Sequence, residues 1–388
     1  MSSSERRIPL SEPSIGGNAG TYLQACLETN FVSSVGPFVE RFEREFAAAV
    51  GARYAVACSS GTAAIHLALL VLDVSPGDDV LVSDLTFVAS VNPIVQTGGR
   101  PVLVDAERST YDLDPDLVVA ELDRRARVGE RQPAAIEVVH LVGHPADIEP
   151  IITAADRYGI PVVEDASEAL GATYTAGPYA GRGVGTIGRI SAFSFNGNKL
   201  ITTGGGGMIV TDDEALARRA RHLSTQARLP GLAYDHDEVG YNYRLTNVAA
   251  ALGLAQLEEL PRLLGGRRAN ATRYDAAIAD IPGLLPAPRA SWADPSFWLY
   301  TPMLASPDIA HRDRIIAGLA AGGIEARPIW TPIHRTRLYA DAARIGGAAA
   351  ESIFAGAFCL PSSSSLTDGE RDRVIACLAT VAGAMMSS

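Results

Sequence analysis

Lys199 is the only lysine in the chain, and all the others among its 33 lysine and arginine residues are arginines. A guanidinium group stays protonated at ordinary pH values, whereas a primary amine can lose its proton and form a Schiff base with an aldehyde. Lys199 ends the motif SFNGNK (194–199), and four glycines follow at 204–207, where the backbone can approach a ligand closely. This setting favours a reactive amine. The alternative is chance retention of one lysine in an arginine-rich protein.

Ser60, Gly61 and Thr62 lie between a strand-like run (54–59) and a helix-like run (62–72). The start of a helix offers free backbone N–H groups and the positive end of the helix dipole, and both attract anions such as phosphate. Serine and threonine are also the preferred helix caps, so the motif taken alone is better explained as an ordinary cap.

An acidic cluster, Glu164 to Glu168, follows the apolar run IPVV (160–163). Carboxylates at the end of a parallel strand lie in the ligand crevice of an open α/β sheet. Asp165 could therefore bind Mg²⁺, a ribose or a ring nitrogen, while a solvated acidic turn is the alternative. The lack of a second acidic cluster with suitable spacing argues against the metal.

A phosphate site, a buried acid and a single amine together match pyridoxal 5′-phosphate. Its phosphate needs an anion site, its aldehyde needs the amine of Lys199, and its ring nitrogen needs the carboxylate of Asp165 to stay protonated. Phe87 follows a strand candidate (79–83) and could stack on the ring face, although a phenylalanine that opens a helix more often belongs to the core.

The elements that must position these residues alternate strand and helix over the first 250 residues. Strands separated by crossover helices indicate a mostly parallel sheet covered on both faces. The predicted strands are 54–59, 79–83, 101–105, 134–140, 160–165, 190–195 and 206–211. The predicted helices include one that begins at Pro37 and ends at Gly51, together with 62–72, 87–96, 114–127 and 147–158. We expect a large domain over 1–255 and a smaller mixed domain over 256–388, where prolines become frequent.

Composition narrows the class of protein. With 47% hydrophobic and 20% charged residues the chain is globular, and its net charge of −11 disfavours nucleic acid or an anionic membrane as a partner. Four widely spaced cysteines and an N-terminus without an apolar segment lead us to expect a cytoplasmic protein. His140 and His144 have no third ligand candidate nearby, so we expect no metal site.

The sequence resembles the sugar-nucleotide aminotransferases of pyridoxal phosphate fold type I, the DegT/DnrJ/StrS group. The matching motifs run along nearly the whole chain. They include SSVGPFVERFEREFAAAVGA, SSGTAAIHLAL, VVHLVGHPADIEPI, VVEDASEALGA, SAFSFNGNKLITTGGGGMIV, GYNYRLTNVAAALGLAQLEEL and EARPIWTPIH. The resemblance implies an aspartate-aminotransferase-like fold, with a large α/β domain and a smaller C-terminal α/β domain.

The resemblance also implies a role for individual residues. Asn242 resembles the asparagine that reaches the cofactor phosphate from a neighbouring subunit, which would place the active site across a homodimer interface. Glu168 stands where many members have Gln or His beside the ring hydroxyl, so its contact is left open. The expected cofactor-binding residues are Ser60, Gly61, Thr62, Phe87, Asp165, Glu168, Ser194, Lys199 and Asn242, of which Lys199 and Asp165 are catalytic. Arg327 and His334 are expected to contact substrate, although a solvated arginine and a loop-capping histidine are the simpler interpretations.

The function that the resemblance implies is transfer of an amino group from L-glutamate to a nucleotide-linked keto sugar. The loop around Lys199 is similar to enzymes that make UDP-linked 4-amino sugars, which predicts amination at C4 of a UDP-linked 4-keto-6-deoxy hexose. A GDP- or dTDP-linked sugar, amination at C3, a sugar dehydratase and a non-catalytic pyridoxal phosphate-binding regulator are the alternatives.

Overall fold

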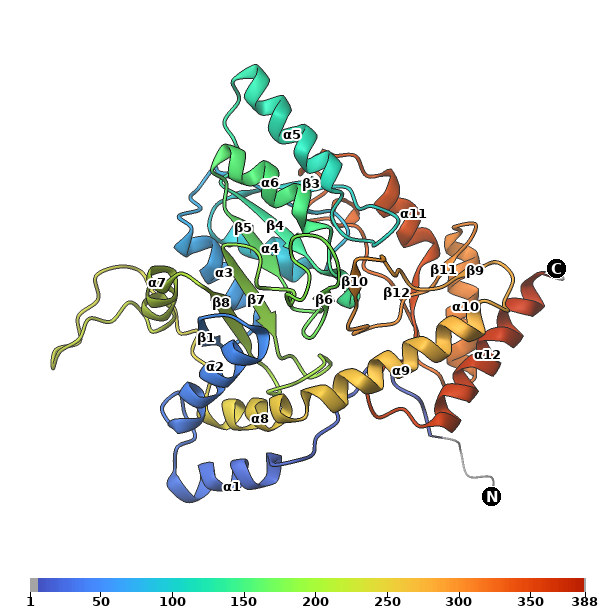
Figure 1. Cartoon of the computed structure of the whole chain (residues 1–388), viewed down its shortest axis with the longest axis horizontal. Coiled ribbons are helices and arrows are strands. Elements are labelled where there is room, and N and C mark those ends of the chain that lie inside the picture. The colour runs from blue at the N-terminus through green and yellow to red at the C-terminus, as the bar shows by residue number, and fades with distance from the viewer. Residues whose placement is uncertain (1–5, 387–388) are drawn as a thin grey trace.

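The computed structural model describes residues 6–386, and its centre is an eight-stranded sheet between two layers of helices (Figure 1). Strand β8 is antiparallel to both of its neighbours, β1 and β7, and the remaining neighbours pair in parallel. The order across the sheet is β1 (Tyr54–Cys58), β8 (Gly207–Thr211), β7 (Ile190–Ser194), β5 (Val162–Asp165), β4 (Ala135–Val139), β2 (Asp79–Ser83), β3 (Arg100–Val104) and β13 (Ala343–Ile345).

Alternate residues of the strands belong to two hydrophobic cores, one on each face of the sheet, as the period of two in a strand requires. Four helices pack on one face: α2 (Pro37–Val50), α5 (Pro115–Val128), α6 (Ile148–Tyr158) and α8 (Asn247–Glu258). Three helices pack on the other: α3 (Gly61–Val71), α4 (Val88–Gln96) and α7 (Glu214–Ser224). Both faces are covered, which confirms the predicted doubly covered, mostly parallel sheet.

Helix α2 shows how local sequence sets these elements. Pro37 opens the helix and Gly51 ends it in the left-handed conformation, with φ of 83°. Phe42 and Phe46 lie one turn apart and are completely buried against Phe193 and Phe195 of the sheet region. Helix α2 therefore packs against the end of β7, the strand that precedes Lys199.

The C-terminal part forms a separate hydrophobic core that also contains Ile8 from the N-terminal segment. Its helices are α9 (Leu260–Ile278), α10 (Ile309–Ala321), α11 (Ala348–Gly356) and α12 (Asp368–Met386). The remaining elements of the described chain are α1 (Ala19–Thr29), η1 (Leu141–Gly143), β6 (Thr173–Tyr174), β9 (Leu284–Leu285), β10 (Ala293–Asp294), β11 (Met303–Leu304), β12 (Arg327–Pro328), η2 (Ile333–Arg335) and β14 (Phe358–Cys359). Among residues 6–386, no helix is both long and apolar enough to span a bilayer.

Two features cross the predicted boundary between residues 255 and 256. Helix α8 continues to Glu258, and β13 of the C-terminal part pairs in parallel with β3 at the edge of the large sheet. The division into 1–255 and 256–388 stays a prediction.

Candidate active site

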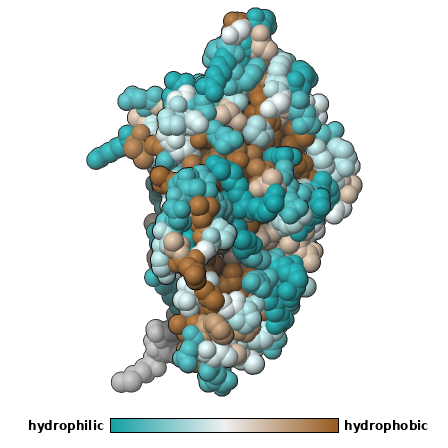
Figure 2. Space-filling model, turned by 90° about the vertical axis from the view of Figure 1, so that its left-hand side faces the viewer, coloured by the Kyte–Doolittle hydropathy of each residue, from teal (hydrophilic) through white to brown (hydrophobic). Residues whose placement is uncertain are grey.

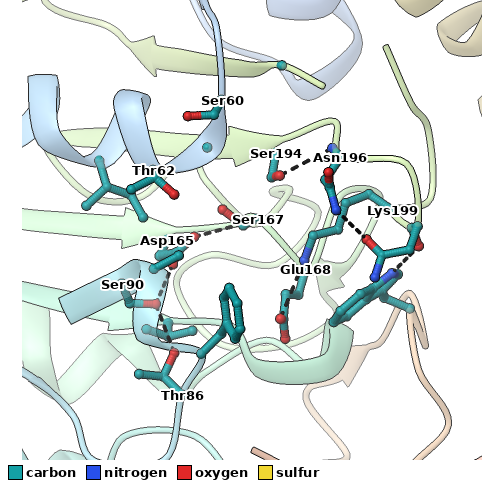
Figure 3. Close-up of a pocket in the computed structure, with 18 of the residues that line it drawn as sticks. Ser60, Thr62, Thr86, Ser90, Asp165, Ser167, Glu168, Ser194, Asn196 and Lys199 are labelled. Atoms are coloured by element: carbon teal, nitrogen blue, oxygen red, sulfur yellow. Dashed lines mark hydrogen bonds and ion pairs between the residues drawn. The ribbon is translucent and has the colours of Figure 1, made fainter. Parts of the chain in front are cut away.

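A cavity of about 330 Å³ opens where β5 and β7 end, beside the start of α3 (Figure 3). Its walls come from parts of the chain that are far apart in sequence. The lining residues include Ser60, Gly61, Thr62, Thr86, Phe87, Ser90, Asp165, Ser167, Glu168, Ser194, Asn198, Lys199, Trp298 and Trp330. Most of the residues that sequence predicted for the cofactor site therefore meet in one place.

The start of α3 forms one wall of the cavity. Ser60 caps the helix from an extended backbone, and its Oγ accepts a hydrogen bond of 3.0 Å from the N–H of Ala63. The cap satisfies one of the N–H groups that a helix start leaves without an intrahelical partner, and the others remain available to an anion. Gly61 and Thr62, whose N–H groups precede that of Ala63 in the first turn, line the cavity.

Two glycines allow this wall to close against the end of β7. A Cβ on Gly61 would lie 2.8 Å from Cβ of Ser194, and a Cβ on Gly207 would lie 2.4 Å from the carbonyl oxygen of Ser60. Gly207 pairs with both Cys58 and Ser194 in the antiparallel part of the sheet. The antiparallel strand β8 thus brings the hydroxyl of Ser194 beside the helix start.

Asp165 ends β5 and is 4% exposed. Ser90 Oγ donates to its Oδ2 at 2.8 Å, and the N–H of Ser167 donates to its Oδ1 at 3.0 Å. Thr86 Oγ1 and Ser90 Oγ are in turn 2.9 Å apart, so a short hydroxyl chain supports the carboxylate (Figure 3). Donors on both oxygens fix the direction of the carboxylate.

Lys199 enters the same cavity from the loop after β7. Its Nζ lies 3.5 Å from Glu168 Oε1 and 3.6 Å from the centre of the Trp298 ring (Figure 3). Burial lowers the pKa of Lys199, and the negative charges of Glu168 and Asp165 oppose that shift. Burial therefore raises the fraction of neutral, nucleophilic amine.

Glu168 is buried beside Lys199, and a backbone N–H group fixes its carboxylate. The N–H of Val142 donates to its Oε2 at 2.8 Å, which leaves Oε1 toward the amine. Burial raises the pKa of Glu168, while the charge of Lys199 and the Val142 hydrogen bond lower it. The contact of Glu168 that the sequence left open is thus, in this structure, a contact with Lys199.

An aromatic wall faces these polar groups. Trp330 lies between Phe87 and Trp298, with ring centres 5.0 Å and 6.3 Å apart respectively. Phe87 precedes α4 and is 48% exposed, so it lines the cavity and is not a core residue. The wall presents flat apolar surface on which a planar ring or a sugar face can stack.

Comparison with known proteins identifies the family of the chain over nearly its whole length. The model of the DegT/DnrJ/EryC1/StrS aminotransferase family matches residues 13–379. The chain belongs to this family. GDP-perosamine synthase from Caulobacter vibrioides is 40% identical over 373 residues, which cover 96% of this chain and 97% of that protein.

Solved structures agree with the assignment. The sugar aminotransferase CalS13 from Micromonospora echinospora superposes with a TM-score of 0.85 at 30% identity, over 96% of this chain and 99% of that one. The PLP form of Spr1654 from Streptococcus pneumoniae gives a TM-score of 0.87 at 27% identity, over 97% and 99% of the two chains. This chain is a pyridoxal phosphate-dependent sugar aminotransferase. The predicted fold, cofactor and enzyme class are confirmed.

The cavity fits the cofactor of the aminotransferase. The helix start of α3 and Ser194 offer donors to a phosphate, Asp165 presents a fixed carboxylate, and Lys199 presents a buried amine without a second lysine to compete. The glycine at position 61 adds no side chain to the helix start, where a Cβ would lie only 2.8 Å from Cβ of Ser194. When bound, pyridoxal phosphate supplies an aldehyde and an electron-accepting ring.

The two residues predicted to contact substrate, Arg327 and His334, lie outside the lining of the cavity. Arg327 is exposed and pairs with Glu325 at 3.0 Å. His334 lies between Asp84 and Glu351, with Nδ1 2.5 Å from Asp84 Oδ2 and Nε2 2.9 Å from Glu351 Oε1. In this chain both have structural partners, and the predicted contact with substrate stays a prediction.

Asn242 is exposed and pairs with Thr225 through an isolated β-bridge. It does not line the cavity of its own chain. The contribution expected from the resemblance would thus have to reach a second copy of the chain.

Several lining residues were not predicted. Ser90 lies in the first turn of α4 and donates a hydrogen bond to Asp165. The sequence feature that could have indicated this role is its position just after strand β2, at the same edge of the sheet. Trp298 and Trp330 are two of the three tryptophans in the sequence. Trp330 lies in the motif EARPIWTPIH, whereas rarity was the only sign of Trp298. They come from the C-terminal part, which the linear sequence does not connect to the cavity.

Proposed function

We propose that this aminotransferase moves the amino group of L-glutamate to the keto carbon of a nucleotide-linked sugar, a 4-keto-6-deoxy hexose aminated at C4. The observation that carries the proposal is the meeting of Lys199 and Asp165 in one cavity, with a helix start for the cofactor phosphate. The similarity over nearly full length to GDP-perosamine synthases favours a GDP-linked sugar over the UDP-linked sugar that the loop of Lys199 resembles.

The residues of the chain have separate tasks in this reaction. Lys199, whose pKa is lowered by burial, is placed to take a proton from the reacting carbon of glutamate and to return one at the sugar carbon. Asp165, held by Ser90 and Ser167, would offer its carboxylate to the ring nitrogen of the cofactor. Trp298 and Trp330 exclude water from one side of the cavity and offer a surface to the sugar.

A substrate panel tests the proposal. The enzyme loaded with cofactor is incubated with L-glutamate and, in separate reactions, with GDP-, UDP- and dTDP-linked 4-keto-6-deoxy hexoses. We expect a keto-to-amine mass change with the GDP-linked sugar, one 2-oxoglutarate per amine formed, and the highest kcat/KM for that nucleotide. The Lys199→Ala variant is the control. Sugar conversion without consumption of glutamate would instead indicate an eliminating enzyme, and a preference for UDP or dTDP would refute the nucleotide assignment.

A homodimer with shared sites is part of the same proposal. Apolar side chains gather among polar ones on the face shown in Figure 2, on the side of the molecule where α1, α7 and the loop after α7 lie in Figure 1. Exposed apolar residues in α1, the segment after it and that loop are Leu27, Phe31, Val32, Val35, Leu232, Tyr234 and Val239. A second copy covering this surface would bury apolar area and could bring Asn242 to the partner's cavity.

Mixing two inactive variants tests the shared site. Lys199→Ala and Asn242→Ala chains are purified separately, then unfolded and refolded together. If each cavity uses Asn242 of the partner subunit, half of the mixed dimers' sites are intact, so the mixture should recover about a quarter of the wild-type activity by random pairing. The same variants refolded alone are the control. Recovery no greater than the sum of these controls would contradict a shared site.

A further inference from the structure

The backbone just before Lys199 is held by two distant parts of the chain. The carbonyl oxygen of Asn198 accepts a hydrogen bond of 2.8 Å from Ser11 Oγ and another of 2.7 Å from Trp298 Nε1. Ser11 belongs to the N-terminal segment, and Trp298 lies between β10 and β11 in the C-terminal part. The position of the reactive lysine therefore depends on contacts that the large sheet does not supply.

Arg267 of α9 joins both donors. Its Nη1 donates to the carbonyl oxygen of Trp298 at 2.5 Å, and its Nη2 donates to Ser11 Oγ at 3.1 Å. One guanidinium thus holds the side chain of Ser11 and the backbone of Trp298, the two residues that donate to Asn198. Because a guanidinium is planar and its donors are fixed in direction, it sets the relative position of its two partners.

The charge of Arg267 is buried. The residue is 1% exposed, and within residues 6–386 no carboxylate forms an ion pair with it, while its Nε has no hydrogen-bond partner. By contrast, the buried Arg125 pairs with both Asp79 and Glu121. Burying an unpaired charge is costly, and neutral polar contacts would serve a merely structural clamp at lower cost.

The charged groups that act on Lys199 come from β5, from the turn after it and from α9. Glu168 follows β5 and lies 3.5 Å from Nζ, and Asp165 ends β5. Both negative charges raise the pKa of Lys199, whereas Arg267 from α9 is the positive charge that lowers it. Burial also lowers the pKa of Arg267 itself, to about 9.

We propose that Arg267 is a positioning residue for Lys199: it holds the backbone of Asn198 through Ser11 and Trp298, and its unpaired positive charge opposes a second positive charge on the amine. The inference rests on Lys199 as the cofactor-binding lysine of the aminotransferase. It does not depend on which sugar the enzyme accepts.

The single lysine gives a direct test. Protein produced with lysine carrying ¹³C at Cε has one labelled side chain, so a titration of the cofactor-free protein reports the pKa of Lys199 alone. We expect the midpoint to move to higher pH in Arg267→Gln, and to lower pH in Glu168→Gln, because these changes remove charges of opposite sign. The readout needs neither substrate nor turnover, so its result is separate from the outcome of the substrate panel.

Arg268→Gln is the matched control, because Arg268 is the next residue of α9 and pairs with Asp294 at 2.8 Å. It should leave the midpoint in place. Arg267→Met, which fills the same space without charge, serves if the glutamine variant does not fold. An unchanged midpoint in a folded Arg267 variant, or an equal shift in Arg268→Gln, would overturn the charge role.

The variant Ser11→Ala tests the positioning role separately. Ser11 is a half-buried residue of the N-terminal segment, so this test can be made even if neither Arg267 variant folds. It removes one of the two hydrogen bonds to Asn198 and keeps the charge of Arg267. We expect slower formation of the adduct between Lys199 and pyridoxal phosphate, followed by absorbance, with the midpoint unmoved. An unchanged rate of adduct formation would refute the positioning role.

Discussion

Replacing Lys199 with alanine should reduce turnover by about 10⁴-fold or more. In the proposed mechanism the amine both forms the bond to the cofactor and transfers the proton at the reacting carbon, and each role alone is worth orders of magnitude. The chain contains no second lysine, so no neighbouring amine can take over. Turnover is measured with glutamate and the best sugar of the panel, with cofactor content determined separately.

Lys199→Arg is the matched variant, because it keeps length and positive charge but cannot lose its proton. It should be as inactive as Lys199→Ala. Borohydride reduction of the wild-type holoenzyme, followed by peptide mass analysis, should place one pyridoxyl group on Lys199 and none in either variant. Turnover of Lys199→Ala near the wild-type rate would remove the proposed mechanism.

Asp165→Asn should lower kcat by about 10²- to 10³-fold with little change in stability. The asparagine can keep the hydrogen bond from the N–H of Ser167, and its amide can donate to Ser90 Oγ, so the local structure is preserved. The negative charge toward the cofactor ring is lost. Steady-state kinetics at saturating glutamate measure the effect, and thermal unfolding shows whether the fold is intact.

Glu164→Gln is a control from the adjacent position on the same strand. Glu164 is fully buried on the opposite face of the sheet, where it contacts His140 and accepts hydrogen bonds from the N–H groups of Gly185, Ile187 and Gly188. We expect this change to cost about 1–3 kcal/mol of unfolding free energy and to leave kcat per folded molecule nearly unchanged. A loss of kcat as large as that of Asp165→Asn would contradict a specific role for Asp165.

The sequence predicts the elements of the large sheet well, because each carries a local signal. Apolar runs bounded by glycine or proline give β2 and α2 almost to the residue. The same local patterns place Ser60 at the start of a helix and Asp165 at the end of a strand, and both are positions where ligands bind. The residues that meet in the cavity were for this reason largely foreseeable.

The contacts between distant segments were not foreseeable. Nothing near Ser11, Arg267 or Trp298 in the sequence indicates that all three converge on Asn198, because such convergence depends on the packing of α9 and the N-terminal segment. The place of β13 is a similar case. Its three residues are mostly exposed and carry no apolar alternation, so their pairing with β3 is set by tertiary structure.

Strand β13 also constrains how the molecule can move. It is hydrogen-bonded to β3 although it lies in the C-terminal part of the chain, and Gly346 and Gly347 follow it with φ of 77° and 126°. The C-terminal part cannot swing as one rigid block over the cavity while this strand stays paired. The N–H of Gly347 also donates to Asp105 Oδ2 at 2.6 Å, so the link between the C-terminal part and the large sheet continues past the strand.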